Sequence, residues 1–308
     1  MRIGDAPARV VRASSSEIHV IVPGADARDE ERSVARSGRM PVFVADAPEE
    51  AAMLEVGAPV ATGLHMVDSP AIDRAGIIWA TFSGTRSQQS AVTIYRVAAG
   101  RAREPFVTSI AHPTSLAAAP DGALYITDRF EGTLYRVEHD GRVETIASDL
   151  GVPCGLAFGP DGSLYVGDRS GRIIRLRDGA ERAVVAALPP SVAAFHLAWG
   201  PDGRLYVTAP TLDTRDPVYG VTPDGEVEVL PVTFGRPQGL AFDHLGRLYV
   251  ADALAGAAGI FRVSLEDFSM EKVVAAPHVV GLCFGPDGSF AVASADAIHR
   301  FTGPATDL

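Results

Sequence analysis

The sequence predicts an all-β fold made of six similar repeats. One pattern recurs along the 308 residues and is clearest at Pro153–Asp168. It consists of an apolar strand, a Pro-Asp-Gly turn and a second strand. The turn glycines are separated by 46, 40, 41, 43 and 42 residues: Gly76, Gly122, Gly162, Gly203, Gly246 and Gly288. A period of about 40–45 residues with four strand signals per repeat is typical of propeller blades. We therefore expect a six-bladed β-propeller.

The turn residues explain why the chain reverses at each of these points. Pro160 presets the backbone angle φ, Asp161 can accept a hydrogen bond from its own backbone, and Gly162 can adopt a positive φ. The flanking runs are rich in aliphatic and aromatic residues, which favour strands. Each copy of the motif therefore predicts an inner strand, a tight turn and a second strand.

The ends of the chain indicate how the ring closes. The second repeat shows four strands, at about 115–119, 123–127, 133–138 and 142–148. The last repeat shows only three, at about 280–284, 289–293 and 298–302. We expect a strand within Met53–Ala61 to complete the last blade, because closure removes the exposed edges of an open ring.

Two columns of residues predict how neighbouring blades pack. The fourth position before each turn glycine is mostly bulky: Ile72, Ala118, Phe158, Trp199, Phe242 and Phe284. The fifth position before it is small: Ala71, Ala117, Ala157, Ala198, Ala241 and Cys283. Because successive side chains alternate across a strand, bulky faces can pack against small faces of the adjacent blade.

The first 50 residues do not follow the repeat, so we divide the chain into residues 1–50 and 51–308. Ala8–Pro23 predicts a β-hairpin around a Ser-rich turn, Asp26–Arg39 a polar loop, and Met40–Val44 another strand. The hairpin resembles part of an immunoglobulin-like IPT/TIG module, although about 45 residues are too few for a complete sandwich. The alternative is a plain N-terminal extension.

Composition limits the partners and the compartment. The net charge is −11 and the 27 basic residues are scattered, which argues against nucleic acid. No apolar run of about 20 residues predicts a membrane span. The first residues show no signal-peptide core, so we expect a cytoplasmic protein, or a periplasmic or secreted one if a signal was removed. The two cysteines have neither metal-type spacing nor a disulfide framework.

The run Gly155–Val166 and its copies resemble the six-bladed propellers of the SMP-30/gluconolactonase and NHL-repeat group. The resemblance covers about residues 53–308 and implies a small-molecule site at one mouth of the central channel. One implied activity is the hydrolysis of a sugar lactone or a similar ester. The alternative is a non-catalytic, NHL-like scaffold that binds a protein or another ligand, because one fold hosts many functions.

The resemblance also implies a divalent metal, Ca²⁺ or Mg²⁺, at the start of the inner strands. The eighth position before each turn glycine holds Asp68, Thr114, Cys154, Phe195, Gln238 and Val280. Asp68 stands where these lactonases carry glutamate, Cys154 where they carry asparagine, and Phe195 where they carry aspartate. Asp68, Thr114 and Gln238 are the metal ligands that remain, although hard cations prefer several oxygen ligands including carboxylates.

Histidines gather at the predicted entrances of the inner strands. They are His65, His112, His196 and His278. An imidazole there can bind Zn²⁺ or act as a general base, or it can simply hydrogen-bond within its loop. We name Asp68 as metal ligand or base, assisted by His112 or His196.

Two arginines occupy equivalent places after the second strands of adjacent blades. Arg129 and Arg169 can grip a carboxylate or sugar acid. They can equally pair with Glu131 or with the strand-end aspartates Asp128, Asp168 and Asp252, which are suited to capping turns. The remaining candidates for ligand contact at the mouth are Glu131, Cys154, Gln238 and Arg236.

Overall fold

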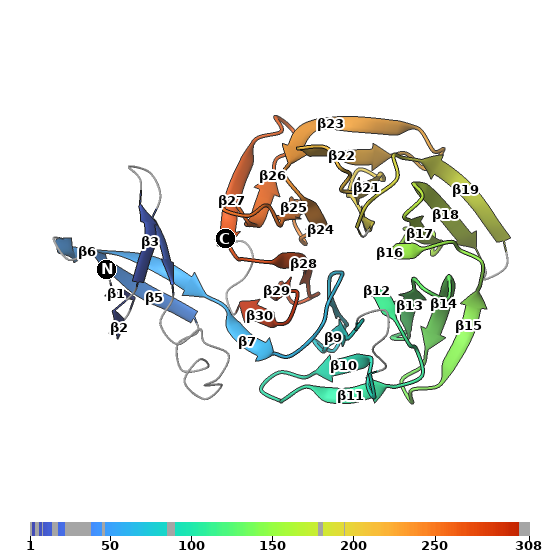
Figure 1. The fold of residues 1–308 in the computed structure, drawn as a ribbon, viewed down its shortest axis with the longest axis horizontal. Helices are drawn as coiled ribbons and strands as arrows, with labels where there is room; N and C mark the ends of the chain where they lie inside the picture. Colours follow the sequence, from blue (N-terminus) through green and yellow to red (C-terminus); the bar gives the residue numbers. More distant parts are fainter. Residues whose placement is uncertain are drawn as a thin grey trace.

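The computed structural model describes residues 57–84, 90–177, 182–193 and 195–301 in full, and the strands within residues 2–56 by their backbone. Within these residues the chain forms a six-bladed β-propeller of four-stranded antiparallel sheets, as the turn spacing predicts (Figure 1). Each inner strand runs toward its turn glycine. We call the face with these turns the turn face, and the opposite face, where the chain enters the inner strands, the entrance face.

The first three blades follow the chain outward from the axis. Blade 1 contains β8 (Ala71–Ile72), β9 (Ile78–Thr81), β10 (Ile94–Val97) and β11 (Glu104–Val107). Blade 2 contains β12 (Pro113–Ala118), β13 (Leu124–Asp128), β14 (Thr133–Val137) and β15 (Val143–Ala147). Blade 3 contains β16 (Pro153–Phe158), β17 (Leu164–Asp168), β18 (Arg172–Arg177) and β19 (Glu181–Ala187).

The last three blades repeat this order until the ring closes. Blade 4 contains β20 (His196–Trp199), β21 (Leu205–Thr208), β22 (Asp216–Val221) and β23 (Val227–Phe234). Blade 5 contains β24 (Pro237–Phe242), β25 (Leu248–Asp252), β26 (Gly259–Val263) and β27 (Met270–Ala275). Blade 6 contains β28 (Val279–Phe284), β29 (Phe290–Ser294), β30 (Ile298–Phe301) and β7 (Ala58–Ala61).

The closing strand β7 confirms the expected closure but is shorter than the predicted stretch. It pairs antiparallel with β30, with Ala61 opposite Ile298. Residues 53–56 belong instead to β6 (Ala47–Val56), which pairs with β5 (Gly38–Val44). Gly57 separates the two strands, and a side chain there would meet the Phe301 ring, its nearest atom 2.9 Å from an added Cβ.

The N-terminal residues contain the predicted hairpin. It consists of β3 (Arg9–Ala13) and β4 (Ile18–Ile21), which pair antiparallel. The strand predicted at 40–44 is β5, in a sheet with β6, β1 (Arg2–Ile3) and β2 (Ala6–Pro7). Residues 22–37, which hold most of the predicted loop, lie outside the described residues. The likeness to an IPT/TIG module stays a prediction, and β6 crosses the proposed boundary at residue 50.

Bulky and small faces meet between adjacent blades as predicted. Phe158 of blade 3 packs in one core cluster with Ala117 of blade 2, and Trp199 of blade 4 packs in another with Ala157 of blade 3. A tyrosine from the preceding blade contacts each aromatic ring, with centroids 4.9–5.1 Å apart: Tyr125–Phe158, Tyr165–Trp199, Tyr206–Phe242 and Tyr249–Phe284. These contacts explain why the two columns recur with the period of the blade.

The strand-end aspartates are structural, as one of the two interpretations expected. Asp168 accepts hydrogen bonds from the Val152 amide at 2.9 Å and the Ser170 hydroxyl at 2.6 Å, and it pairs with Arg172 at 2.6 Å. Asp128 and Asp252 bind the corresponding backbone amides in blades 2 and 5. Each carboxylate therefore ties the loop that enters an inner strand to the loop that leaves the second strand.

This role predicts an acid-dependent loss of stability. Burial alone would raise the pKa of Asp168, but hydrogen bonds from Ser170, Val152 and Arg172 outweigh it and lower the pKa. A lowered pKa in the folded state contributes stability above the unfolded pKa of about 3.9 that is lost as pH falls through the folded value. We expect Asp168→Asn to lower the free energy of unfolding by about 1–3 kcal/mol at pH 7 and by progressively less below about pH 4.

Urea unfolding at pH 7, 5 and 3 measures this difference. Asp224→Asn is the matched control, because Asp224 is exposed and its carboxylate makes no hydrogen bond among the described residues. A constant difference between Asp168→Asn and the unsubstituted protein at all three pH values would contradict the assignment.

Candidate functional site

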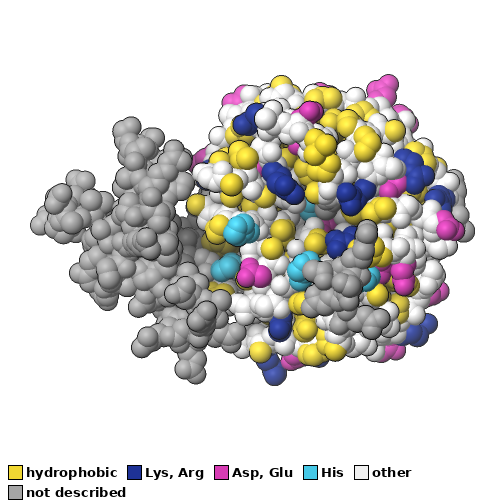
Figure 2. Space-filling view, viewed as in Figure 1, with side chains coloured by type: hydrophobic (Ala, Val, Ile, Leu, Met, Phe, Trp, Pro, Cys, Tyr) yellow, Lys and Arg dark blue, Asp and Glu magenta, His cyan; other side chains and the backbone are white. Residues whose placement is uncertain are grey.

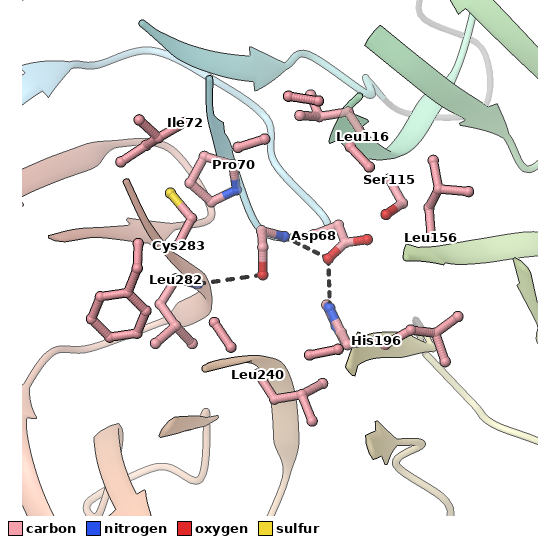
Figure 3. Close-up of a pocket in the computed structure, with 18 of the residues that line it drawn as sticks. Asp68, Pro70, Ile72, Ser115, Leu116, Leu156, His196, Leu240, Leu282 and Cys283 are labelled. Carbon is pink, nitrogen blue, oxygen red and sulfur yellow. Dashed lines mark hydrogen bonds and ion pairs between the residues drawn. The ribbon is translucent and has the colours of Figure 1, made fainter. Parts of the chain in front are cut away.

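Asp68 and His196 meet across the central channel of the propeller. Asp68 immediately precedes the inner strand of blade 1, whereas His196 begins β20 of blade 4, on the opposite side of the ring. The His196 Nδ1 atom lies 2.6 Å from the Asp68 Oδ1 atom, and the two side chains are only 1% and 6% exposed. Figure 3 shows this bond near the axis, surrounded by leucines of several blades. The structure therefore joins two of the three residues that the sequence named as catalytic.

Glycines let these two segments approach the axis. The seventh position before the turn glycine holds Ser69 in blade 1 and His196 in blade 4, but Gly155, Gly239 and Gly281 in blades 3, 5 and 6. A Cβ atom at Gly239 or Gly281 would lie 2.4 Å from the Ser69 hydroxyl oxygen. The same hydroxyl accepts a hydrogen bond from the Leu282 amide at 3.4 Å. Side chains at these glycines would displace the segment that carries Asp68.

The hydrogen bonds assign the proton within the pair. Asp68 Oδ1 also accepts from the Ser69 amide at 2.5 Å, and a carboxylate can only accept. The proton between Asp68 and a neutral His196 therefore resides on Nδ1, which leaves Nε2 as an acceptor with a free lone pair. His196 Nε2 and Asp68 Oδ2 are both buried and have no hydrogen-bond partner among the described residues. This arrangement is that of a general base oriented by a carboxylate.

A cavity of about 310 Å³ lies against the pair. Its walls are successive rings of equivalent residues from the inner strands. The ring nearest the pair contains Pro70, Leu116, Leu156, Leu197, Leu240 and Leu282. Asp68, Ser69, Ser115 and His196 form its polar end (Figure 3). Ser69 and Ser115 were not anticipated, although both stand in the same repeat column as His196.

The three predicted metal ligands differ in their relation to this cavity. Asp68 lines the cavity, but Thr114 and Gln238 are not among the lining residues. The Thr114 hydroxyl donates to the His112 carbonyl at 3.4 Å. No group of three His, Cys, Asp or Glu side chains that could hold a metal ion occurs among the described residues. With a single carboxylate, whose Oδ1 already accepts two hydrogen bonds, the column does not fit a hard divalent cation.

Cys154 is a buried thiol at the start of β16. Burial raises its pKa to about 12, although the charges of Arg169 and Arg129 lower it in part. A thiol with this pKa stays protonated at neutral pH and is a poor nucleophile. Its role as a ligand contact stays a prediction.

His112, the third residue named as catalytic, is held by the entrance loops of blades 1 and 2. Its Nδ1 lies 3.2 Å from the Ser83 carbonyl oxygen, and its ring contacts that of Phe130 with centroids 4.5 Å apart. Its backbone amide donates to Asp128 at 2.9 Å. These contacts are with its own loop neighbourhood rather than with Asp68 or His196.

The charged residues predicted at the mouth make contacts within their own loops and with neighbouring loops. Arg169 donates to the Val192 carbonyl at 3.0 Å, and Arg129 lies over the Phe130 ring at 5.1 Å. Glu131 accepts a hydrogen bond from Tyr135, and the exposed Arg236 binds Asp252 through its backbone amide. Figure 2 shows basic and histidine side chains gathered near the centre of the propeller face that it displays. Ligand binding by these residues stays a prediction.

Comparison with known proteins shows which family the chain resembles. The sequence profile of the virginiamycin B lyase family matches residues 70–304. No curated protein matches the sequence. No helix long and apolar enough to cross a membrane occurs in the described part of the chain.

Solved structures share the fold at low sequence identity. A streptogramin B lyase is 18% identical, with a TM-score of 0.58 and 87% of each chain covered. A gluconolactonase from Xanthomonas campestris is 12% identical, with a TM-score of 0.64 and 97% of each chain covered. A catalytically inactive histidine-to-alanine variant of virginiamycin B lyase from Staphylococcus aureus, solved with quinupristin, is 16% identical, with a TM-score of 0.54 and 80% of this chain and 87% of that chain covered.

The fold expected from the resemblance to gluconolactonases is therefore found. The profile match, however, is to a different group of propellers, and it spans well over half of the chain. The protein belongs to the virginiamycin B lyase family.

Proposed function

We propose that this protein cleaves the C–O bond of an ester or lactone, with His196 as general base and Asp68 as the residue that orients it. The observation that carries the proposal is the 2.6 Å bond between His196 Nδ1 and Asp68 Oδ1 at the polar end of a cavity, with His196 Nε2 lacking a hydrogen-bond partner among the described residues. Membership in a family named for a lyase supports it. The inactive histidine variant of the Staphylococcus aureus relative supports the use of a histidine.

The pair can promote either of two reactions. In an elimination, Nε2 removes a proton from the carbon next to a carbonyl, a double bond forms, and the adjacent C–O bond breaks to release a carboxylate. In a hydrolysis, Nε2 removes a proton from water, the oxygen adds to the ester carbonyl, and the C–O bond breaks to give an acid and an alcohol. In both, Asp68 stabilises the imidazolium ion. Ser115, at the same end of the cavity, is placed to donate a hydrogen bond to an ester oxygen.

Burial of the Asp68–His196 pair favours one alternative, in which the pair has a structural role. Because both side chains are almost fully inaccessible, the bond can instead serve as a structural tie between blades 1 and 4. The protein would then be a non-catalytic scaffold that binds a ligand or a protein elsewhere. Loss of the tie would lower stability without any change in chemistry.

A panel of esters and lactones tests the proposal. Elimination yields an unsaturated carbonyl product that absorbs in the ultraviolet, whereas hydrolysis in ¹⁸O-labelled water places the label in the acid. We expect cleavage of at least one compound, reduced about 10-fold or more by Asp68→Asn, because a neutral amide no longer stabilises the imidazolium. No cleavage by the unsubstituted protein, or equal cleavage by a folded Asp68→Asn variant, would refute the assignment.

A further inference from the structure

We propose that the ligand reaches the Asp68–His196 pair from the turn face, through a port between blades 1 and 2, and that it is a compact apolar molecule ending in a carboxylate. The ester within this ligand rests on the proposed function. The port and the carboxylate preference rest on separate observations.

The cavity has a polar end and an apolar end. Proceeding from the polar end, its lining passes through the ring of leucines and a ring of small residues to an outer ring. The outer ring contains Ile72, Ala118, Trp199, Phe242 and Phe284, at the ends of the inner strands. At about 3.3 Å per residue, Trp199 lies about 10 Å along its strand from His196. A ligand that meets the catalytic pair therefore places its apolar part toward the turn face.

A second hollow adjoins the cavity near the turns. Its volume is about 220 Å³, and it shares Ile72 and Ala118 with the first cavity. Its other lining residues belong to the turns of blades 1, 2 and 6: Asp73, Arg74, Ala119, Pro120 and Pro286. The two shared residues are only half-buried. The two hollows therefore meet at Ile72 and Ala118, which makes this the place where we put the port.

Ala118 explains why the port lies between these blades. Its column holds an aromatic residue in blades 3, 4, 5 and 6, each contacting a tyrosine of the preceding blade. In blade 2 the ring is missing, and Trp79, which stands in the tyrosine column, contacts Phe106 instead at 4.7 Å. Ala118 packs in one cluster with Trp79 and Phe106, and its small side chain lines both hollows.

Arg74 supplies an unpaired charge at this port. On five turns, an aspartate pairs with an arginine: Asp121–Arg136, Asp161–Arg177, Asp202–Arg204, Asp243–Arg247 and Asp287–Arg300. On the turn of blade 1, Asp73 instead accepts a hydrogen bond from the Trp79 indole at 2.9 Å. Arg74 is exposed and has no ion-pair partner among the described residues. A guanidinium in this position favours a carboxylate, which it can bind through two hydrogen bonds.

The fluorescence of Trp199 tests the port without any catalytic turnover. The chain has two tryptophans, of which Trp199 lines the cavity and Trp79 does not, so the emission of the chain with both tryptophans retained serves as the reporter. The probes are 4-phenylbutyrate and its neutral analogue 4-phenylbutanol. We expect a saturable change in Trp199 emission with both, and about 10-fold or more weaker binding after Ala118→Phe, because the ring fills the port.

Two controls keep the test decisive. The column already holds Phe in blades 3, 5 and 6, so Ala118→Phe is expected to fold, and Ala118→Leu provides a smaller obstruction if it does not. Leu254→Phe places a ring on the entrance face, where Leu254 follows β25 and is exposed, and it is expected to leave probe binding unchanged. Unchanged binding in both Ala118 variants, or weakening by Leu254→Phe alone, would overturn the port.

Arg74→Ala tests the carboxylate preference. We expect it to weaken 4-phenylbutyrate binding about 3- to 10-fold and to leave 4-phenylbutanol unaffected, because only the acid pairs with the guanidinium. Equal effects on the two probes, or none on either, would overturn the preference. None of these measurements uses turnover. The port can therefore be refuted while the catalytic assignment holds, and the catalytic assignment can be refuted while the port holds.

Discussion

Replacement of His196 by alanine is expected to lower kcat/KM for the cleaved ester by about 10²–10⁴-fold, the usual contribution of a general base. The reason is that no other described side chain lies within hydrogen-bond distance of Asp68 to take over the proton. The measurement is initial rate against substrate concentration for the compound that the ester panel identifies.

The His196→Ala substitution also affects stability, so a second variant is needed. Removing the imidazole leaves the Asp68 carboxylate buried without its partner, which costs about 3–5 kcal/mol when a buried pair is broken. His196→Gln keeps an N–H donor of similar reach but cannot act as a base, and it is expected to be inactive while more stable than the alanine variant.

His278→Ala is the matched surface control. His278 belongs to an entrance loop and is exposed, so its removal should leave the rate within about twofold, as expected for a position outside any buried network. Full activity in a folded His196→Gln variant would contradict catalysis by His196 and favour the structural tie between blades 1 and 4.

Gly155→Ala is expected to be among the most damaging single substitutions for stability. A Cβ atom at this position would lie 1.8 Å from the carbonyl oxygen of Phe195 and 3.3 Å from Leu197 Cγ. Both obstacles belong to the segment that carries His196, and a backbone carbonyl cannot swing aside like a flexible side chain. We expect the free energy of unfolding to fall by about 3 kcal/mol or more.

Gly220→Ala is the control for this substitution. Its added Cβ atom would meet Leu230 Cδ1 at 3.4 Å and Arg204 at 3.7 Å, both ordinary contacts with side chains, and its backbone is not in the left-handed region. Urea unfolding of the two variants should differ by about 2 kcal/mol or more, since a substitution without a steric clash costs about 1 kcal/mol or less. Similar stability of the two variants would mean that the inner strands of blades 3 and 4 are less closely packed than the structure shows.

The architecture was predictable because each blade repeats the same local sequence pattern. The turn glycines all adopt positive φ, between 76° and 87°, which explains their fixed place in every repeat. Alternation of bulky and small residues, and an aspartate at the end of the second strand, likewise act within a blade or between neighbours. The period was enough to number the blades, and the missing fourth strand of the last repeat was enough to expect that an N-terminal strand closes the ring.

The boundary of that closing strand was not predictable. Residues 53–61 form one apolar stretch in the sequence, but the structure divides them at Gly57 between two sheets. Either partner satisfies the backbone hydrogen bonds of an extended segment, so local propensity does not choose between them. The choice depends on which strand edges lie within reach after the ring has formed.

The sequence by itself determined the six-bladed fold, its packing columns and the separate candidacies of Asp68 and His196. Only the tertiary structure decided that these two residues form one pair, because 128 residues separate them and ring closure alone brings blades 1 and 4 face to face. It also showed that Ala118 lines two hollows, whereas the sequence shows only a small residue in a bulky column. Local patterns that recur in each repeat determine the scaffold. A site on the axis depends instead on which residues the six blades place there together.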